Sequence, residues 1–95
     1  MKLYWSQEAR ARLRAIHAEV AKDAPMRAAA SVQRLADRAA QLQTAPESGR
    51  RVPEYPEKPL RELLERPYRI IYRLTPTQIE IVTVYHYRQR LPDDL

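Results

Sequence analysis

Two runs of β-forming residues separated by a turn constrain the fold more than any other part of the chain. The segment from Tyr68 to Arg90, YRIIYRLTPTQIEIVTVYHYRQR, is rich in Ile, Val, Tyr and Thr, which fit a pleated, half-buried surface. Thr75 to Gln78 has turn chemistry, because Pro76 fixes φ and donates no hydrogen bond to a ladder. The sequence therefore predicts an antiparallel hairpin that ends in a polar tail.

The register of this predicted hairpin follows from its turn. The first run then pairs with the second as follows: Leu74 with Ile79, Arg73 with Glu80, Ile71 with Val82, and Arg69 with Val84. The pairing of Arg73 with Glu80 places opposite charges across the strands, as a correct register favours. The same register gives Arg69 and His86 equal strand parity, so we expect both side chains on one face of the sheet.

Length and composition limit the class of protein. A chain of 95 residues forms one domain with a modest core, which we expect to span residues 1–95. Cysteine is absent, which excludes disulfides and fits a reducing cytoplasm, and two histidines without cysteine argue against a zinc site. The N-terminus has no apolar signal core and no apolar run could span a membrane. We therefore expect a cytoplasmic protein without a membrane partner, metal or cofactor.

The net charge of +5 and the pI near 9.9 favour an acidic partner, either nucleic acid or an acidic protein segment. Nearly all the basic residues are arginine, which suits bidentate contacts with carboxylates or phosphates. Many arginines also solvate helix surfaces. We expect that role for six of them: Arg10, Arg12, Arg14, Arg27, Arg34 and Arg38.

The first half of the chain predicts a short strand followed by two helices. Lys2 to Trp5 has strand propensity, and Ser6 suits the N-cap of a helix that ends near Lys22. Asp23 is a candidate cap for a second helix, in which Pro25 is tolerated in the first turn. Apolar residues recur at helical spacing in both: Ala9, Leu13, Ile16 and Val20, then Ala28, Val32, Leu35, Ala39 and Leu42. The two helices are expected to form an antiparallel hairpin.

The middle of the chain, Thr44 to Pro59, resembles a linker, with four prolines and the only glycine. Leu60 to Glu65 is predicted to be a strand, because it is too short to hold as a helix between this loop and Pro67. The predicted fold class is α+β. It has a short N-terminal strand, a helical hairpin, and then a three-stranded antiparallel sheet with the helices packed on one face.

In this order and spacing, the pieces resemble the ParE/RelE superfamily of bacterial type II toxins. They are Trp5-Ser6, a helical hairpin, GRRVPE at 49–54, LREL at 60–63, YRIIY at 68–72, and His86 followed by arginines and Leu91-Pro92. The resemblance implies the RelE/ParE-like toxin fold. It also implies the toxin of a plasmid-stabilisation module, a growth inhibitor neutralised by a cognate antitoxin of the ParD or RelB kind.

Within the superfamily, the resemblance points to two targets. GRRVPE, LREL before YRIIY, and a histidine followed by basic residues and Leu-Pro are similar to the ParE branch, which is implied to inhibit DNA gyrase through protein contacts. The other branch, similar to RelE and YoeB, is implied to cut mRNA on the ribosome. Such cleavage needs a base, an acid and cationic donors around the phosphate.

The nuclease alternative depends on few residues. The RelE-like lysine cluster is absent, since the chain has only Lys2, Lys22 and Lys58. The resemblance to YoeB implies Arg69, His86 and Tyr87 as catalytic residues, with a carboxylate from Glu54 or Glu62. The chain continues beyond Tyr87, where the YoeB pattern ends. We therefore prefer the gyrase inhibitor to the enzyme.

The expected contact surface for the target or the antitoxin is the strand hairpin and its tail. The residues expected there are Arg61, Arg69, Arg73, His86, Arg88 and Arg90. A second version places the antitoxin on the helical hairpin, whose groove suits an amphipathic helix, while the sheet edge suits an added strand. No DNA-reading motif accompanies the basic residues, and the resemblance assigns operator binding to the antitoxin.

Overall fold

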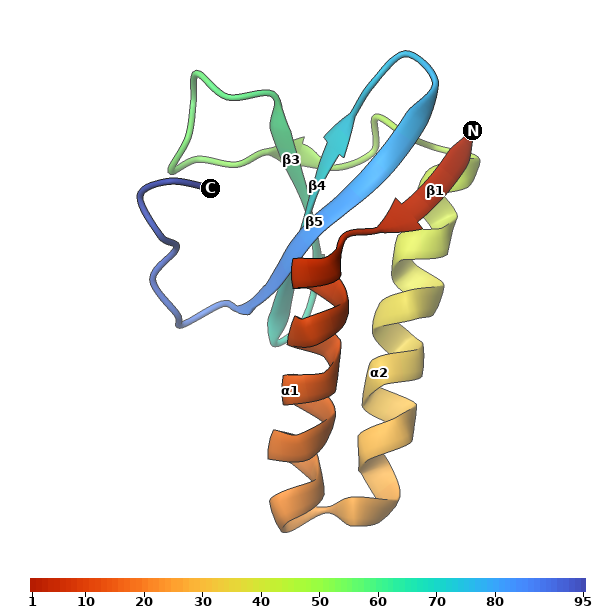
Figure 1. The fold of residues 1–95 in the computed structure, drawn as a ribbon, viewed down its shortest axis with the longest axis vertical. Coiled ribbons are helices and arrows are strands. Elements are labelled where there is room, and N and C mark those ends of the chain that lie inside the picture. The colour runs from red at the N-terminus through yellow and green to blue at the C-terminus, as the bar shows by residue number, and fades with distance from the viewer.

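Five strands form one mixed sheet, and two helices cover one of its faces (Figure 1). The computed structural model describes all 95 residues. The elements in chain order are β1 (Lys2–Trp5), α1 (Gln7–Asp23), α2 (Pro25–Ala40), the 3-10 turn η1 (Gln41–Gln43), β2 (Arg50–Arg51), β3 (Leu60–Glu65), β4 (Tyr68–Leu74) and β5 (Gln78–His86). Neither helix is long and apolar enough to cross a membrane. The predicted α+β class, helical hairpin and strand at Leu60–Glu65 are confirmed.

The sheet has two more strands than predicted, and it is not wholly antiparallel. Its order is β1-β5-β4-β3-β2. The predicted antiparallel strands β3, β4 and β5 form its centre, while β1 pairs in parallel with β5 and β2 adds two residues beside β3. The strand at Lys2–Trp5 was predicted and is confirmed, but its parallel pairing with β5, far along the chain, was not predicted. The second addition, β2, lies in the proline-rich loop, where no strand was predicted.

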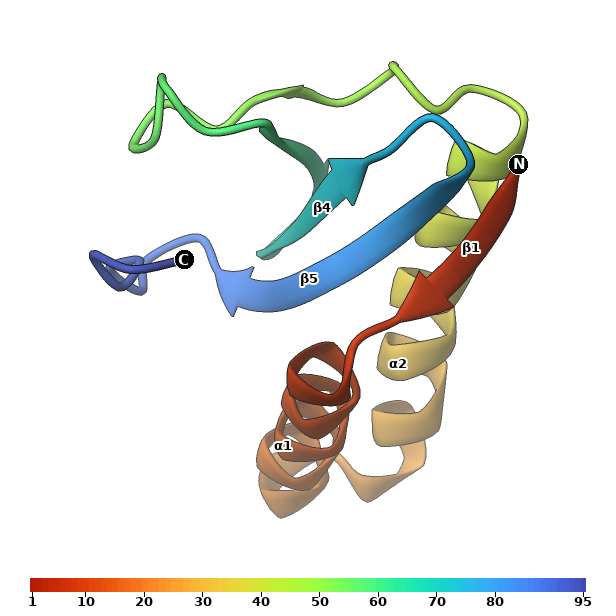
Figure 2. The ribbon, with the colours of Figure 1, turned by 45° about the horizontal axis from the view of Figure 1, so that its top comes forward.

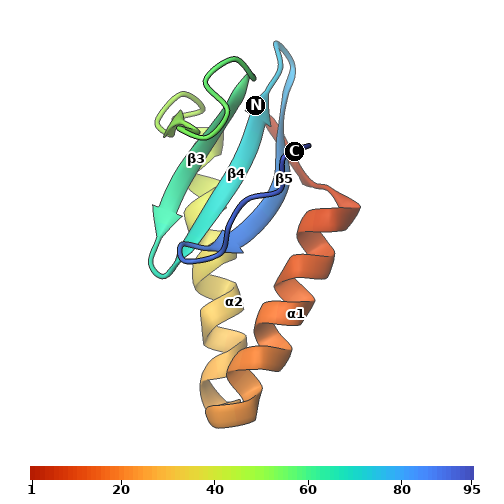
Figure 3. The same ribbon diagram turned by 90° about the vertical axis from the view of Figure 1, so that its left-hand side faces the viewer.

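The helical hairpin begins where the sequence predicts and turns one residue later. The backbone N–H of Ala9 donates to Ser6 Oγ at 2.9 Å, so Ser6 caps α1. Asp23 does not cap α2: it is the last residue of α1, and Ala24 precedes α2 without a side-chain cap. Pro25 takes the first helical position, where its missing N–H has no intrahelical partner to lose. The hairpin extends well beyond the end of the sheet (Figure 3).

A bulge changes the predicted register halfway along the strand hairpin. Near the turn, the pairs Leu74–Ile79 and Arg73–Glu80 are as predicted. The register then shifts between Ile71 and Tyr72, so the other two predicted pairs are wrong: Ile71 lies opposite Thr83 and Arg69 opposite Tyr85. One extra residue in β5 reverses the alternation of its side chains beyond that point. Arg69 and His86 therefore lie on opposite faces of the sheet, and not on one face as expected.

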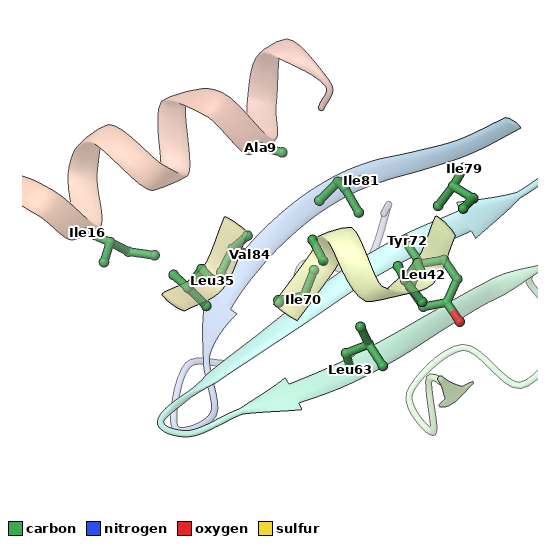
Figure 4. Packing of buried hydrophobic residues seen from close by; sticks show 11 residues of the cluster. Ala9, Ile16, Leu35, Leu42, Leu63, Ile70, Tyr72, Ile79, Ile81 and Val84 are labelled. Carbon is green, nitrogen blue, oxygen red and sulfur yellow. The ribbon is translucent and has the colours of Figure 1, made fainter. Parts of the chain in front are cut away.

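The main core lies between the helices and the sheet (Figure 4). Its eleven buried residues come from both helices, η1 and the three central strands: Ala9, Ile16, Leu35, Ala39, Leu42, Leu63, Ile70, Tyr72, Ile79, Ile81 and Val84. The phenol of Tyr72 donates to the Pro46 carbonyl at 2.8 Å and accepts from the Gly49 N–H at 3.0 Å. A Cβ on Gly49 would lie 2.6 Å from the Tyr72 ring, so this close approach requires glycine.

The opposite face of the sheet is covered by the proline-rich loop and the C-terminal tail. Four residues form a second buried cluster there, Val52, Leu60, Ile71 and Leu91, with Tyr55 and Leu95 packed against it. The tail runs over β5 while the helices lie behind the sheet (Figure 3), and the loop and the tail extend to the same side (Figure 2). This face of the sheet is therefore partly covered by the proline-rich loop and the C-terminal tail.

Candidate functional site

Four charged side chains connect the proline-rich loop to the tail-covered face. Arg69 is buried, and its Nε donates to Glu62 Oε1 at 2.6 Å. Its Nη1 and Nη2 donate to the two carboxylate oxygens of Glu54, at 2.7 and 2.8 Å. Arg50 Nε donates to the other oxygen of Glu62 at 2.6 Å. Every nitrogen of the Arg69 guanidinium thus already has a carboxylate partner.

The electrostatics of this network fix both partners in their charged forms. The hydrogen bonds from Arg69 lower the pKa of Glu54, more than partial burial raises it. Glu54 and Glu62 in turn hold the pKa of Arg69 above its ordinary value. The side chain of Glu62 is fully buried, and each of its carboxylate oxygens pairs with one of two arginines, Arg69 and Arg50. Three of the five N–H donors of Arg69 are therefore engaged by carboxylates, which also balance its charge.

A pocket of about 710 Å³ lies beside this network at the β3–β4 turn. We name it the turn pocket, and its lining residues are Arg50, Pro53, Glu54, Leu64, Arg66, Pro67, Tyr68, Arg69 and Tyr87. Leu64 and Tyr87 are 42% and 52% exposed, unusual values for large hydrophobic residues of this protein. Arg66 is exposed, and none of the ion pairs of the molecule includes it.

His86 lies on the helix-covered side, away from Arg69. Its ring meets Tyr68 edge-on at 5.7 Å between centroids, and it stacks on Tyr87 at 4.9 Å. Its Nδ1 accepts the backbone N–H of Arg88 at 3.1 Å. A groove of about 380 Å³ runs past His86 between α1 and the end of the sheet, lined also by Arg12, Ala15, Ile16, Glu19, Tyr68 and Gln89. No group of three His, Asp or Glu side chains converges to hold a metal ion.

Arg12 ties α1 to the start of the tail, although the sequence pattern placed it on the helix surface. Its Nε donates to the Val84 carbonyl and its Nη2 to Gln89 Oε1, both at 2.9 Å. Its guanidinium also lies over the Tyr85 ring, 4.3 Å from the centroid. Gln89 Oε1 further accepts the His86 N–H at 2.8 Å. Helical periodicity carries no signal for this role, because the partners lie more than 70 residues away in the chain.

The other predicted contact residues are dispersed. Arg61 donates to the Gly49 carbonyl at 2.8 Å and so holds the proline-rich loop. Arg73 pairs with Glu80 at 3.6 Å. Arg88 and Arg90 are exposed on the tail without an acidic partner, and Arg88 packs on the exposed Tyr87 ring. Of the predicted set, Arg69 and Tyr87 share the turn pocket, while His86, Arg61 and Arg73 lie elsewhere.

The comparisons with known proteins agree with this architecture. The family model described as the ParE toxin of the type II toxin–antitoxin system parDE matches residues 3–91. A solved chain of the chromosomal ParDE toxin–antitoxin system from P. aeruginosa is 30% identical, with a TM-score of 0.76 over 90% of this chain and 95% of that one. A search of curated proteins finds no match. The chain belongs to the ParE toxin family of type II toxin–antitoxin systems.

Proposed function

We propose that this toxin inhibits growth in the cytoplasm by binding DNA gyrase, within a plasmid-stabilisation module, and that a ParD-like antitoxin neutralises it. The observation that carries the proposal is the pair of exposed arginines, Arg88 and Arg90, at the start of the tail, ahead of Asp93 and Asp94. Arg88 and Arg90 are exposed and have no acidic partner, while Leu91 just beyond them is buried in the second cluster. The tail thus presents two guanidinium groups without an acidic partner from an anchored segment, although Arg88 also donates to the Tyr87 hydroxyl at 3.1 Å. Such a surface suits an acidic protein partner.

The arrangement of the sheet supports binding over RNA cleavage. Nucleolytic cleavage requires a base and cationic donors that converge on one phosphate. Arg69 is committed to two carboxylates, and His86 lies on the opposite face. The implied catalytic set of Arg69, His86 and Tyr87 is therefore not assembled around one point.

Two candidate surfaces for an antitoxin are the outer edge at the end of β3 and the groove beside His86. The edge of β5 beyond β1 is occupied, because Ser6 Oγ donates to the Val82 carbonyl at 2.8 Å and Arg12 covers that of Val84. The outer edge of β3 has a partner strand only at Arg61 and Glu62. An added strand would therefore pair with the end of β3. An amphipathic helix would instead lie in the groove beside His86.

The target is tested by comparing two assays on purified toxin, gyrase supercoiling with trapped DNA breaks and mRNA ends on programmed ribosomes. We expect gyrase inhibition, and we expect Arg88→Glu with Arg90→Glu to weaken it by about tenfold or more. Arg27→Glu, an exposed arginine at the start of α2, is the matched control. Cuts in mRNA that disappear with His86→Ala would reject the gyrase proposal.

The antitoxin surface needs variants that keep the fold. Arg69→Glu would place a third carboxylate beside Glu54 and Glu62, so loss of antitoxin binding by that variant would not identify a contact. Arg88→Glu changes charge on the surface alone. Antitoxin affinity unchanged by Arg88→Glu would argue against neutralisation at the tail and in favour of the helical hairpin.

A further inference from the structure

The turn pocket combines exposed apolar surface with a free positive charge. Only five large hydrophobic residues of the protein are exposed, and two of them, Leu64 and Tyr87, line this pocket. Pro53 and Pro67 extend the apolar wall. A concave site with exposed apolar walls gains free energy when a partner covers it.

The charges around the pocket leave one cation unmatched. Arg50 and Arg69 are balanced by Glu54 and Glu62 within the network. Arg66, on the turn between β3 and β4, has no such partner and remains exposed. A ligand that filled the apolar part of the pocket would therefore meet a single guanidinium at its rim, which favours one carboxylate beside the apolar group.

We propose that the turn pocket receives a large apolar side chain and an adjacent carboxylate from a flexible acidic segment of the antitoxin. The proposal rests on the proposed neutralisation by an antitoxin and names where part of it occurs. The pocket is concave and, at about 710 Å³, large enough for an apolar side chain and its neighbour, which an extended segment can insert. Leu64 also lies beyond the part of β3 that β2 pairs with, which leaves room for that segment to pass alongside.

The first experiment locates the pocket ligand with a small probe. N-acetylphenylalanine, which carries a ring and a carboxylate, is titrated into the full-length toxin while amide chemical shifts are followed by NMR. We expect shifts centred on Leu64, Arg66 and Tyr87, and about tenfold weaker binding for the uncharged amide of the same compound. The purified antitoxin from the same operon should displace the probe. Binding of the antitoxin without displacement overturns the inference.

The second experiment measures antitoxin affinity with matched variants. Leu64→Ala and Arg66→Gln should each weaken binding by about tenfold, and Arg66→Gln should also reduce its salt dependence. Met26→Ala and Arg27→Gln are the controls, since Met26 is 94% exposed and both residues lie at the far end of the helical hairpin. Equal losses in the pocket and control variants overturn the inference.

The outcomes separate this inference from the function on which it rests. An antitoxin that binds tightly to the wild type and to both pocket variants leaves neutralisation intact and overturns only the assignment of the pocket. An antitoxin that fails to bind the wild type overturns the proposed function itself. Adenosine monophosphate that binds the pocket more tightly than the antitoxin would assign the site to a nucleotide and reject a protein segment.

Discussion

The helix-covered face of the sheet buries eleven apolar residues in one cluster, whereas the tail-covered face buries four beside a network of charged groups. Apolar packing tolerates small shifts, but the network depends on hydrogen bonds of 2.6 to 2.8 Å between Arg69 and two carboxylates. The first face builds the fold. The second positions the loop, the turn pocket and the tail through buried charges, whose loss should cost as much stability as a cavity in the main core.

The largest expected loss of stability comes from Arg69→Met, which removes the guanidinium that pairs with Glu54 and Glu62. It leaves Glu62 buried with Arg50 alone, and we expect a loss of about 3–5 kcal/mol in the free energy of unfolding. Arg73→Met on the same strand removes a partly exposed pair with Glu80 and should cost less than about 1 kcal/mol. Urea denaturation measures both. Equal losses would show that the buried network contributes no more than a surface ion pair.

The next test compares one leucine from each face. Leu35→Ala opens a cavity in the main core and should cost about 3–4 kcal/mol in urea denaturation. Leu91→Ala should cost about 2 kcal/mol, since the tail can move to fill the space. A larger loss in unfolding free energy for Leu91→Ala than for Leu35→Ala would contradict the greater apolar contribution expected of the main core.

Arg12→Met tests the contacts that hold α1 to the end of β5 and to the start of the tail. It keeps the apolar stem but removes the hydrogen bonds to Val84 and Gln89, and should cost about 1–2 kcal/mol. Amide hydrogen exchange should accelerate at His86 and Gln89. Arg10→Met, an exposed neighbour on α1, serves as the control, and the same acceleration in that variant would exclude a specific role for Arg12.

The smallest effect concerns pH. The pKa of Glu54 is lowered in the folded state by Arg69, so its stabilising contribution is present above the unfolded pKa and is lost as pH falls through the folded pKa. Urea midpoints of the wild type should therefore fall on acidification below about pH 4. The fall should be shallower in Glu54→Gln. Parallel curves for the two proteins would contradict the lowered pKa.

Sequence patterns predicted the helix-covered face better than the tail-covered face. Both apolar stripes, the strand at Leu60–Glu65 and the Arg73–Glu80 pair are local patterns, and the structure confirms them. The bulge has a sequence signal that the predicted register missed: the apolar alternation of β5 changes phase between Ile81 and Val82. The role of Arg12 depends on residues more than 70 positions along the chain, so its side chain alone suggests only a charged surface. Glu54 was named as a candidate catalytic carboxylate, but its ion pair with Arg69 across the proline-rich loop was not predicted.

The pairing of β1 with β5 constrains how the toxin is made. Lys2–Trp5 lies beside Gln78–Ile81, and Ser6 and Arg12 contact backbone carbonyls at Val82 and Val84. β1 therefore cannot find its strand partner until β5 has been made, and contacts over such separations form slowly. The helical hairpin, whose contacts are local, can fold during synthesis before the sheet is complete. The proposed contact surface on the tail follows β5 and is therefore among the later parts of the toxin to form.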